Sequence, residues 1–164
     1  MVRESLITDE ARAMIGAITR RQQGVVSLLE AQRWAAAVGD RNPIYFDDEA
    51  ARNAGYRGIV TPPLFLPHAL HRVVDLARLR VDGIQVVKGS SVPLRVSRTM
   101  FGGEETEFFL PIYPGDVIEA ETRVAAIEVK EGSKGPFVLT TTETTYTNQD
   151  GDIVAKGRTF GIAR

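Results

Sequence analysis

The stretch GDRNPIYFD, residues 39–47, places several polar side chains between two segments that have helical patterns. Asp40 can transfer a proton if a partly apolar pocket raises its pKa, and Asn42 can orient a water molecule or the aspartate. Pro43 stiffens the turn that presents them. Five residues after Asp40, where a proton-transfer histidine would be most natural, the sequence has Tyr45. The stretch is compatible with a working active site, an altered one, or a well-formed turn.

Each of these side chains also has a structural interpretation. Asp40 can end a helix and hydrogen-bond within a turn, and Asn42 with Pro43 is an ordinary turn pair. Tyr45 can fill the core with its hydroxyl hydrogen-bonded. Because a phenol has an unperturbed pKa of about 10, Tyr45 is a poor base at neutral pH and is better suited to donating a proton or a hydrogen bond.

Two histidines and an arginine are further candidates. His68 and His71 lie three residues apart, so on a helix they share a face and can approach one ligand. Because no third ligand stands at a useful spacing, we expect no metal there and polar packing at the helix edge instead. Arg57 can meet a phosphate of coenzyme A, although an exposed arginine is more often only solvated.

Composition limits the classes of function. The chain has 164 residues, which suits one domain over residues 1–164. Its 20 Lys and Arg against 21 Asp and Glu give a net charge of -1, which argues against nucleic-acid binding. The absence of cysteine excludes disulfides and thiolate chemistry and fits a reducing compartment. Since no signal peptide or membrane-length apolar run is present, we expect a cytoplasmic protein that is not bound to a membrane.

The first half of the chain is predicted to be helical. One short helix begins at Thr8 or Asp9 and continues to about Ile18. Ser27 and Glu30 have the spacing of a capping box ahead of residues 28–38, which Gly39 ends. A further short helix covers residues 49–54; its cap is Asp47 or Asp48, and Gly55 closes it.

A third helix is predicted to be buried. Thr61 is its expected N-cap and Pro62 its first residue. From Leu64 to Ala77 the segment is apolar over most of its circumference, as in a helix surrounded by other elements. Pro67 removes one backbone donor and should kink this helix or delay its start.

The second half has the pattern of an antiparallel sheet. Five β-type runs, separated by turn signals, are predicted at residues 84–96, 104–113, 116–129, 136–148 and 152–162. Strong turns fall at 114–116 and 148–151, and a shift in the apolar alternation near Ala125–Ala126 indicates a β-bulge. A sheet wrapped around one buried helix satisfies this order, so the predicted fold is α+β, of the hot-dog type.

Two stretches carry a family resemblance. The sequence AAAVGDRNPIYFDDEAARNAGYRGIVTPPLFL resembles the hydratase motif of MaoC-like proteins, Gly-Asp-x-Asn-Pro followed by an x-His pair. The second half, GGEETEFFLPIYPGDVIEAET followed by YTNQDGDIVAKGRT, resembles the MaoC-type N-terminal dehydratase domain. The similarity extends from about residue 24 to the C-terminus. It departs from the family at Tyr45, which occupies the histidine position.

The resemblance implies reversible dehydration of a 3-hydroxyacyl thioester carried on coenzyme A or acyl carrier protein. In the family, the aspartate and histidine act on opposite ends of the water, and N–H groups entering the central helix hold the thioester oxygen. Carried over, these roles fall to Asp40, with Tyr45 second, and to the Thr61–Leu64 segment. Pro62 and Pro63 have no N–H, so only Leu64 still offers a clear donor there. No metal or redox cofactor is expected.

Four interpretations remain open. The chain is a degenerate half of a two-part dehydratase whose MaoC-like partner keeps the Asp–His pair, or a self-sufficient enzyme that uses Asp40 and Tyr45 or draws on His68 or His71. It is otherwise a hot-dog thioesterase with Asp40 activating water, or a non-catalytic acyl-thioester-binding subunit. Because one small hot-dog domain leaves a sheet edge open, we expect a homodimer or a heterodimer with a related domain.

Overall fold

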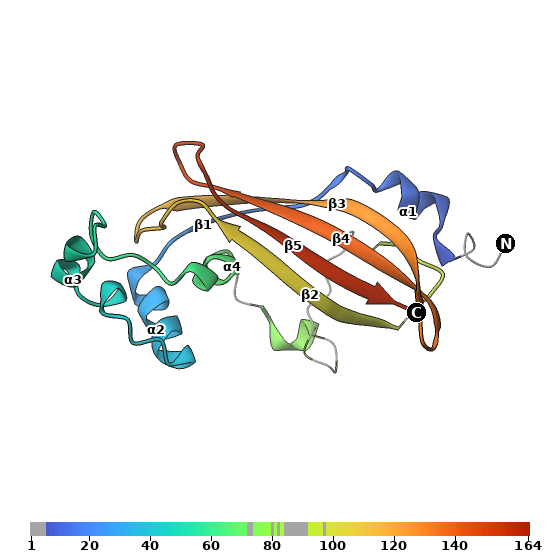
Figure 1. The fold of residues 1–164 in the computed structure, drawn as a ribbon, viewed down its shortest axis with the longest axis horizontal. Coiled ribbons are helices and arrows are strands. Elements are labelled where there is room, and N and C mark those ends of the chain that lie inside the picture. Colours follow the sequence, from blue (N-terminus) through green and yellow to red (C-terminus); the bar gives the residue numbers. More distant parts are fainter. Residues whose placement is uncertain (1–5, 72–73, 80, 82, 84–91, 97) are drawn as a thin grey trace.

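The computed structural model describes residues 6–71, 74–79, 81, 83, 92–96 and 98–164. Five antiparallel strands form one long curved sheet in the order β1-β3-β4-β5-β2 (Figure 1). The strands are β1 (Ile18–Val25), β2 (Thr99–Phe108), β3 (Val117–Gly132), β4 (Gly135–Thr147) and β5 (Ile153–Ala163). β1 and β2 are therefore the two edges of this sheet.

Short helices gather near the ends of the sheet (Figure 1). The α-helices are α1 (Asp9–Ala13), α2 (Leu28–Val38), α3 (Asp48–Asn53) and α4 (Leu66–Ala69), with 3-10 turns η2 (Pro43–Tyr45), η3 (Pro63–Phe65) and η4 (Leu76–Arg78). The predicted caps of α2 are confirmed: the Ser27 hydroxyl accepts from the Glu30 N–H, and Gly39 is left-handed. Asp47 caps α3. These caps end α2 at Val38 and begin α3 after Asp47, so they bound the motif turn at residues 39–47.

Two predictions for the N-terminal half are wrong. The first helix ends at Ala13 instead of continuing to Ile18, and Gly16 turns the chain with a positive φ of 84°. Residues 18–25, to which no strand was assigned, form β1 and pair with β3. Most residues of this segment are polar, so the sequence shows no alternation of apolar and polar side chains. The alternation appears only in the structure, where every second residue from Arg20 to Gly24 is partly buried.

The predicted buried helix is much shorter than expected. Thr61 does not cap it, because its N–H and its hydroxyl both donate to the Ile112 carbonyl, at 2.9 and 3.3 Å. The helical turn begins after Pro62, and α4 ends at Ala69. Leu76 lies in a separate 3-10 turn and is 81% exposed. Prolines at the start remove donors, and the Asp75 carboxylate that caps η4 competes with a continuous helix.

The predicted sheet is largely confirmed. The last three strands occur as expected, and the register of β3 shifts between Val124 and Ala126 where the bulge was predicted. β2 begins at Thr99, earlier than expected, and ends at Phe108. Gly151 has the predicted positive φ, 84°. Most of the strand predicted at 84–96 lies outside the described residues, and Leu94 makes an isolated bridge with Ile7.

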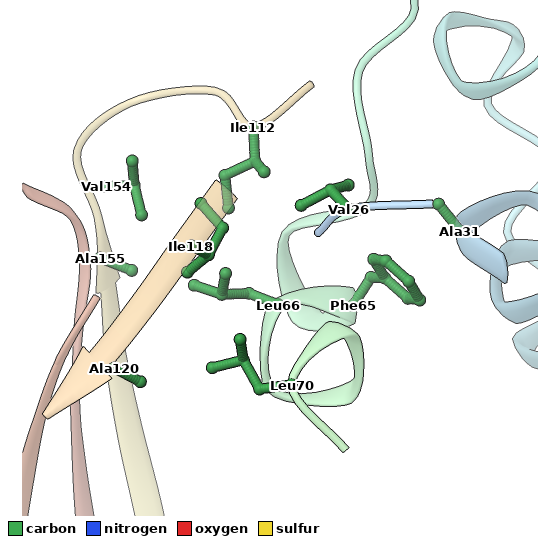
Figure 2. Packing of buried hydrophobic residues seen from close by; sticks show 10 residues of the cluster. All are labelled: Val26, Ala31, Phe65, Leu66, Leu70, Ile112, Ile118, Ala120, Val154 and Ala155. Atoms are coloured by element: carbon green, nitrogen blue, oxygen red, sulfur yellow. The ribbon is translucent and has the colours of Figure 1, made fainter. Parts of the chain in front are cut away.

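The main core lies where the short helix meets one end of the sheet (Figure 2). Phe65 and Leu66 are each 1% exposed and pack with Ile118, Val154 and Ala155. A second core at the other end contains Ile7, Ala11, Val124, Ile127, Val138 and Ala163. The concave face thus has two apolar ends, and the fold is the predicted α+β arrangement of a sheet around a helix.

We expect Ile118→Ala to lower the free energy of unfolding by about 2–5 kcal/mol, because Ile118 is fully buried and truncation leaves a cavity. Ile153→Ala is the matched control, since Ile153 is also in a strand but is 39% exposed, and it should cost well under half as much. Urea unfolding followed by circular dichroism measures both. Equal costs would contradict the assignment of Ile118 to the core.

Candidate functional site

The polar side chains of the motif turn are used to build that turn. The Asp40 N–H donates to the Ala35 carbonyl at 2.9 Å, which closes the end of α2. The Asp40 Oδ1 accepts from the Asn42 N–H at 3.1 Å, and the Asn42 Oδ1 accepts from the Ile44 N–H at 3.3 Å. The Oδ1 atoms of both side chains therefore have the structural role that turn chemistry offers.

Tyr45 lies inward from this turn and is 8% exposed. It packs with Ala35 and Val60, and its carbonyl accepts from the Gln32 Nε2 at 3.2 Å. Burial raises the pKa of Tyr45 above its ordinary value, and the Asp40 charge raises it further, followed by Tyr56. The phenol therefore stays protonated at neutral pH, so it can donate a hydrogen bond but cannot act as a base.

A pocket of about 230 Å³ opens beside Tyr45. Its wall includes Tyr45, Tyr56, Val60, Thr61, Pro63 and Phe108. Asp40 and Asn42 do not line it. The structure thus brings Tyr45 and Thr61 together at a mostly apolar pocket whose wall does not include Asp40 or Asn42, although Asp40 lies near enough for its charge to act on Tyr45.

The entrance to α4 is a weak anion site. Pro62 and Pro63 have no N–H, and Leu64 carries the first backbone donor of the turn. α4 has only four residues, so its dipole is small. The Leu64 side chain is 56% exposed and lies beside a second cavity. Of the two residues expected to hold the thioester oxygen, Thr61 instead hydrogen-bonds to the Ile112 carbonyl. Leu64 is the expected residue whose backbone N–H can still be a donor.

Arg57 has a partner that the sequence did not indicate. Its Nη2 lies 3.0 Å from Oδ1 of the buried Asp116, and its guanidinium stacks on Tyr113, 3.9 Å from the ring centroid. Asp116 also accepts from the Tyr113 N–H and from Gln149. Asp116 therefore ties both Arg57 and the hairpin at 148–151 to the turn at 114–116. The Pro-Gly-Asp sequence predicted the turn at 114–116, but it did not predict the ion pair between Asp116 and Arg57.

The second cavity is a groove of about 410 Å³ between the α4 region and the concave face of the sheet. Trp34, Leu66, His68 and His71 line one side, and residues of β2, β4 and β5 form the floor. Phe108 lines both cavities, and Pro63 lines the pocket while its neighbour Leu64 lines the groove, so pocket and groove adjoin. A ligand that enters the pocket can continue along the groove.

The two histidines lie side by side on the groove wall. Their ring centroids are 5.9 Å apart, and His68 also contacts Phe65. The pKa of His71 is lowered, first by partial burial and then by His68 and Arg20. Among the described residues, no cluster of three metal-ligating side chains exists. His71 is therefore mainly neutral at pH 7, and the pair can hydrogen-bond a ligand.

The sequence of the chain matches one known protein family over most of its length. Residues 13–157 match the model described as "FAS1-like, dehydratase domain region", so the chain belongs to this family. A probable enoyl-CoA hydratase alpha subunit from Thermomonospora curvata is 29% identical over 143 residues, 85% of this chain and 45% of that protein. A UPF0336 protein from Streptomyces avermitilis is 30% identical over 62% of each chain. The chain thus spans about half to two thirds of these curated relatives.

Solved structures confirm the predicted hot-dog fold. A chain of the ChsH1-ChsH2 complex from Mycobacterium tuberculosis has a TM-score of 0.73 at 18% identity, covering 94% of this chain and 88% of that chain. A MaoC-like dehydratase from Rhodospirillum rubrum has a TM-score of 0.59 at 21% identity, covering 90% and 92%. No helix in the described part of the chain is long and apolar enough to cross a bilayer.

We expect proton NMR to show a pKa of His71 below the ordinary value near 6.5. The chain has only two histidines, so His68→Gln and His71→Gln assign the resonances. His68→Gln should move the pKa of His71 part of the way back, because burial is the larger cause and remains. A pKa of His71 at or above the ordinary value would contradict this environment.

Proposed function

We propose that this chain is the acyl-thioester-binding subunit of a two-part 3-hydroxyacyl-thioester dehydratase, in which a MaoC-like partner supplies the Asp–His pair. The carrying observation is Tyr45, a buried phenol with a raised pKa at the position of the catalytic base. Dehydration needs one group to take the α-proton and another to help the hydroxyl leave. A phenol that stays protonated at neutral pH cannot fill the first role.

Two further features support loss of catalysis in this half. Asp40 and Asn42 stabilise their own turn and do not line the pocket. Pro62 and Pro63 remove donors where the thioester oxygen would be held. The adjoining pocket and groove are nevertheless present, with Phe108 between them. Binding of the acyl group is therefore the function that this geometry serves.

The edge strand β2 is the proposed contact with the partner. Among the described strands its ten residues form an edge of the sheet, beside exposed apolar side chains that include Met100, Phe101 and Phe108, with Phe109 and Leu110 just beyond. We propose a heterodimer, because a second copy of this chain would bring another Tyr45 and no histidine at the motif position. The likeness to chains of the ChsH1-ChsH2 and HadBC complexes is in keeping with this arrangement.

The second candidate is a self-sufficient enzyme in which Tyr45 is the acid and Asp40 the base. It is favoured by one observation: Tyr45 lines the pocket and remains protonated, which suits a donor. We rank it second because Asp40 does not line that pocket. Among the described contacts, none favours thioester hydrolysis.

The chain alone should not hydrate crotonyl-CoA or a longer enoyl-CoA, as followed by loss of the enoyl absorbance. Tyr45→His should gain measurable hydration, because a positioned general base contributes about 10²–10⁴-fold, whereas the matched variant Tyr45→Phe should stay inert. Turnover by the wild-type chain that Asp40→Asn abolishes would instead establish the self-sufficient enzyme.

Co-expression with a MaoC-like protein that keeps Asp-x-Asn-Pro-x-His should give a stable, active heterodimer. Phe101→Asp should weaken this complex by about tenfold or more, because Phe101 is 67% exposed on β2 and becomes buried on pairing. Val38→Asp is the control, as Val38 is similarly exposed at 56% but lies on α2. Analytical ultracentrifugation measures both, and equal weakening by the two variants would count against β2 as the interface.

A further inference from the structure

The middle of the concave face is polar, although both ends are apolar. Across four neighbouring strands the register aligns Thr106, Gly157, Thr144 and Thr122 in one row. Tyr146 lies in the next row of β4, beside Ala155. A helix continuing across this face would require apolar contacts here, and α4 is too short to reach beyond the first core. The floor of the groove therefore has another use.

Several hydroxyl groups on this floor have no hydrogen-bond partner among the residues that the structure describes. Thr122 and Thr144 satisfy each other at 2.8 Å. Among the described residues, the hydroxyls of Thr106, Tyr146 and Thr159 have no hydrogen-bond partner, and all three residues line the groove. Because no buried polar side-chain atom in this part of the chain lacks a partner, these hydroxyls are open to solvent. A plain alkyl chain laid over them would remove their water without replacing it, which costs about 1–3 kcal/mol for each group. The floor is therefore unsuited to an unsubstituted acyl chain.

The chemistry of these groups indicates what they bind. Threonine and tyrosine hydroxyls donate to a carbonyl or hydroxyl oxygen, and threonines can also accept. Burial, followed by the charge of Glu104, raises the pKa of Tyr146, so its phenol remains a donor. Glu104 on the same face can accept from a ligand hydroxyl. Donors and an acceptor thus face one cavity.

Gly157 provides the space between these groups. A Cβ at this position would meet the Thr106 Oγ1 at 3.7 Å and the Tyr146 Cε2 at 3.8 Å. These are ordinary contact distances, so a side chain would fit the sheet but would occupy the groove. The missing side chain therefore leaves room for a ligand next to the Thr106 and Tyr146 hydroxyls.

We propose that the groove selects acyl groups that carry an oxygen substituent, a hydroxyl or a keto group, remote from the thioester, and that Thr106, Tyr146 and Thr159 are its specificity-determining residues. This rests on the proposed acyl-thioester binding and adds the chemical class of the acyl group. The apolar rim of Trp34, Leu66 and Phe108 holds the hydrocarbon part of the ligand.

Trp34 is the only tryptophan of the chain and lines the groove, so its fluorescence reports occupancy. Purified chain is titrated with octanoyl-, decanoyl- and dodecanoyl-CoA and with the ω-hydroxy derivative of each. We expect at least one hydroxylated ligand to bind about tenfold more tightly than its unsubstituted counterpart. Tyr146→Phe and Thr106→Val should reduce this preference severalfold, whereas Thr145→Val, on the opposite face of β4, should retain it. Gly157→Val should abolish binding of both ligand types.

Each other outcome overturns a defined part of the argument. Equal affinities, or preference for every unsubstituted ligand, would overturn the selection of oxygenated groups while leaving the proposed acyl-thioester binding intact. A preference retained in both Tyr146→Phe and Thr106→Val would overturn the residue assignment, and binding unchanged in Gly157→Val would place the ligand outside the groove. If no acyl-CoA binds the folded chain, both the inference and the proposed function are wrong.

Discussion

The packing of Phe65 and Leu66 against Ile118 and Val154 fixes the position of every other functional feature (Figure 2). It attaches a single helical turn to one end of the sheet and places Pro63 and Leu64 between the two cavities. Because the helix ends at Ala69, the contact does not extend along the concave face. One small apolar contact therefore determines both where the motif turn lies and how much of the sheet is left for a ligand.

Hydrogen bonds within the motif turn give Asp40 and Asn42 a structural role that does not depend on catalysis. Asp40 and Asn42 close consecutive turns, so replacing either would disturb the backbone whether or not the protein is an enzyme. Tyr45 fills a hydrophobic position, and its burial opposes ionisation. The same surroundings that make the turn stable thus keep the Tyr45 phenol protonated at neutral pH.

Local signals in the sequence predicted the fold better than the site. Ser27, Gly39 and Gly151 have conformations set by their nearest neighbours, so their roles were predictable. The length of the buried helix was not predictable from the sequence. The apolar side chains from Leu64 to Ala77 are compatible with one continuous helix and equally with a helix that ends at Ala69. The pairing of Arg57 with Asp116, 59 residues apart, depends on the folded arrangement and has no signal in either segment.

The altered motif and the polar floor of the groove are both consistent with the proposed pair of subunits, in which this chain binds the acyl group and its partner performs proton transfer. A subunit that performs proton transfer must keep its reacting groups in a dry, closely fitted pocket, which limits how wide and how polar the rest of the cavity can be. A subunit without that task can shorten its helix and line the exposed sheet with threonines, since their hydroxyls can be paired by water or by a ligand. The cost falls on stability, because no helix in the described part of the chain joins the two apolar cores. On the proposed pairing, a partner that covers β2 would offset that cost, so pairing would serve the fold as well as the reaction.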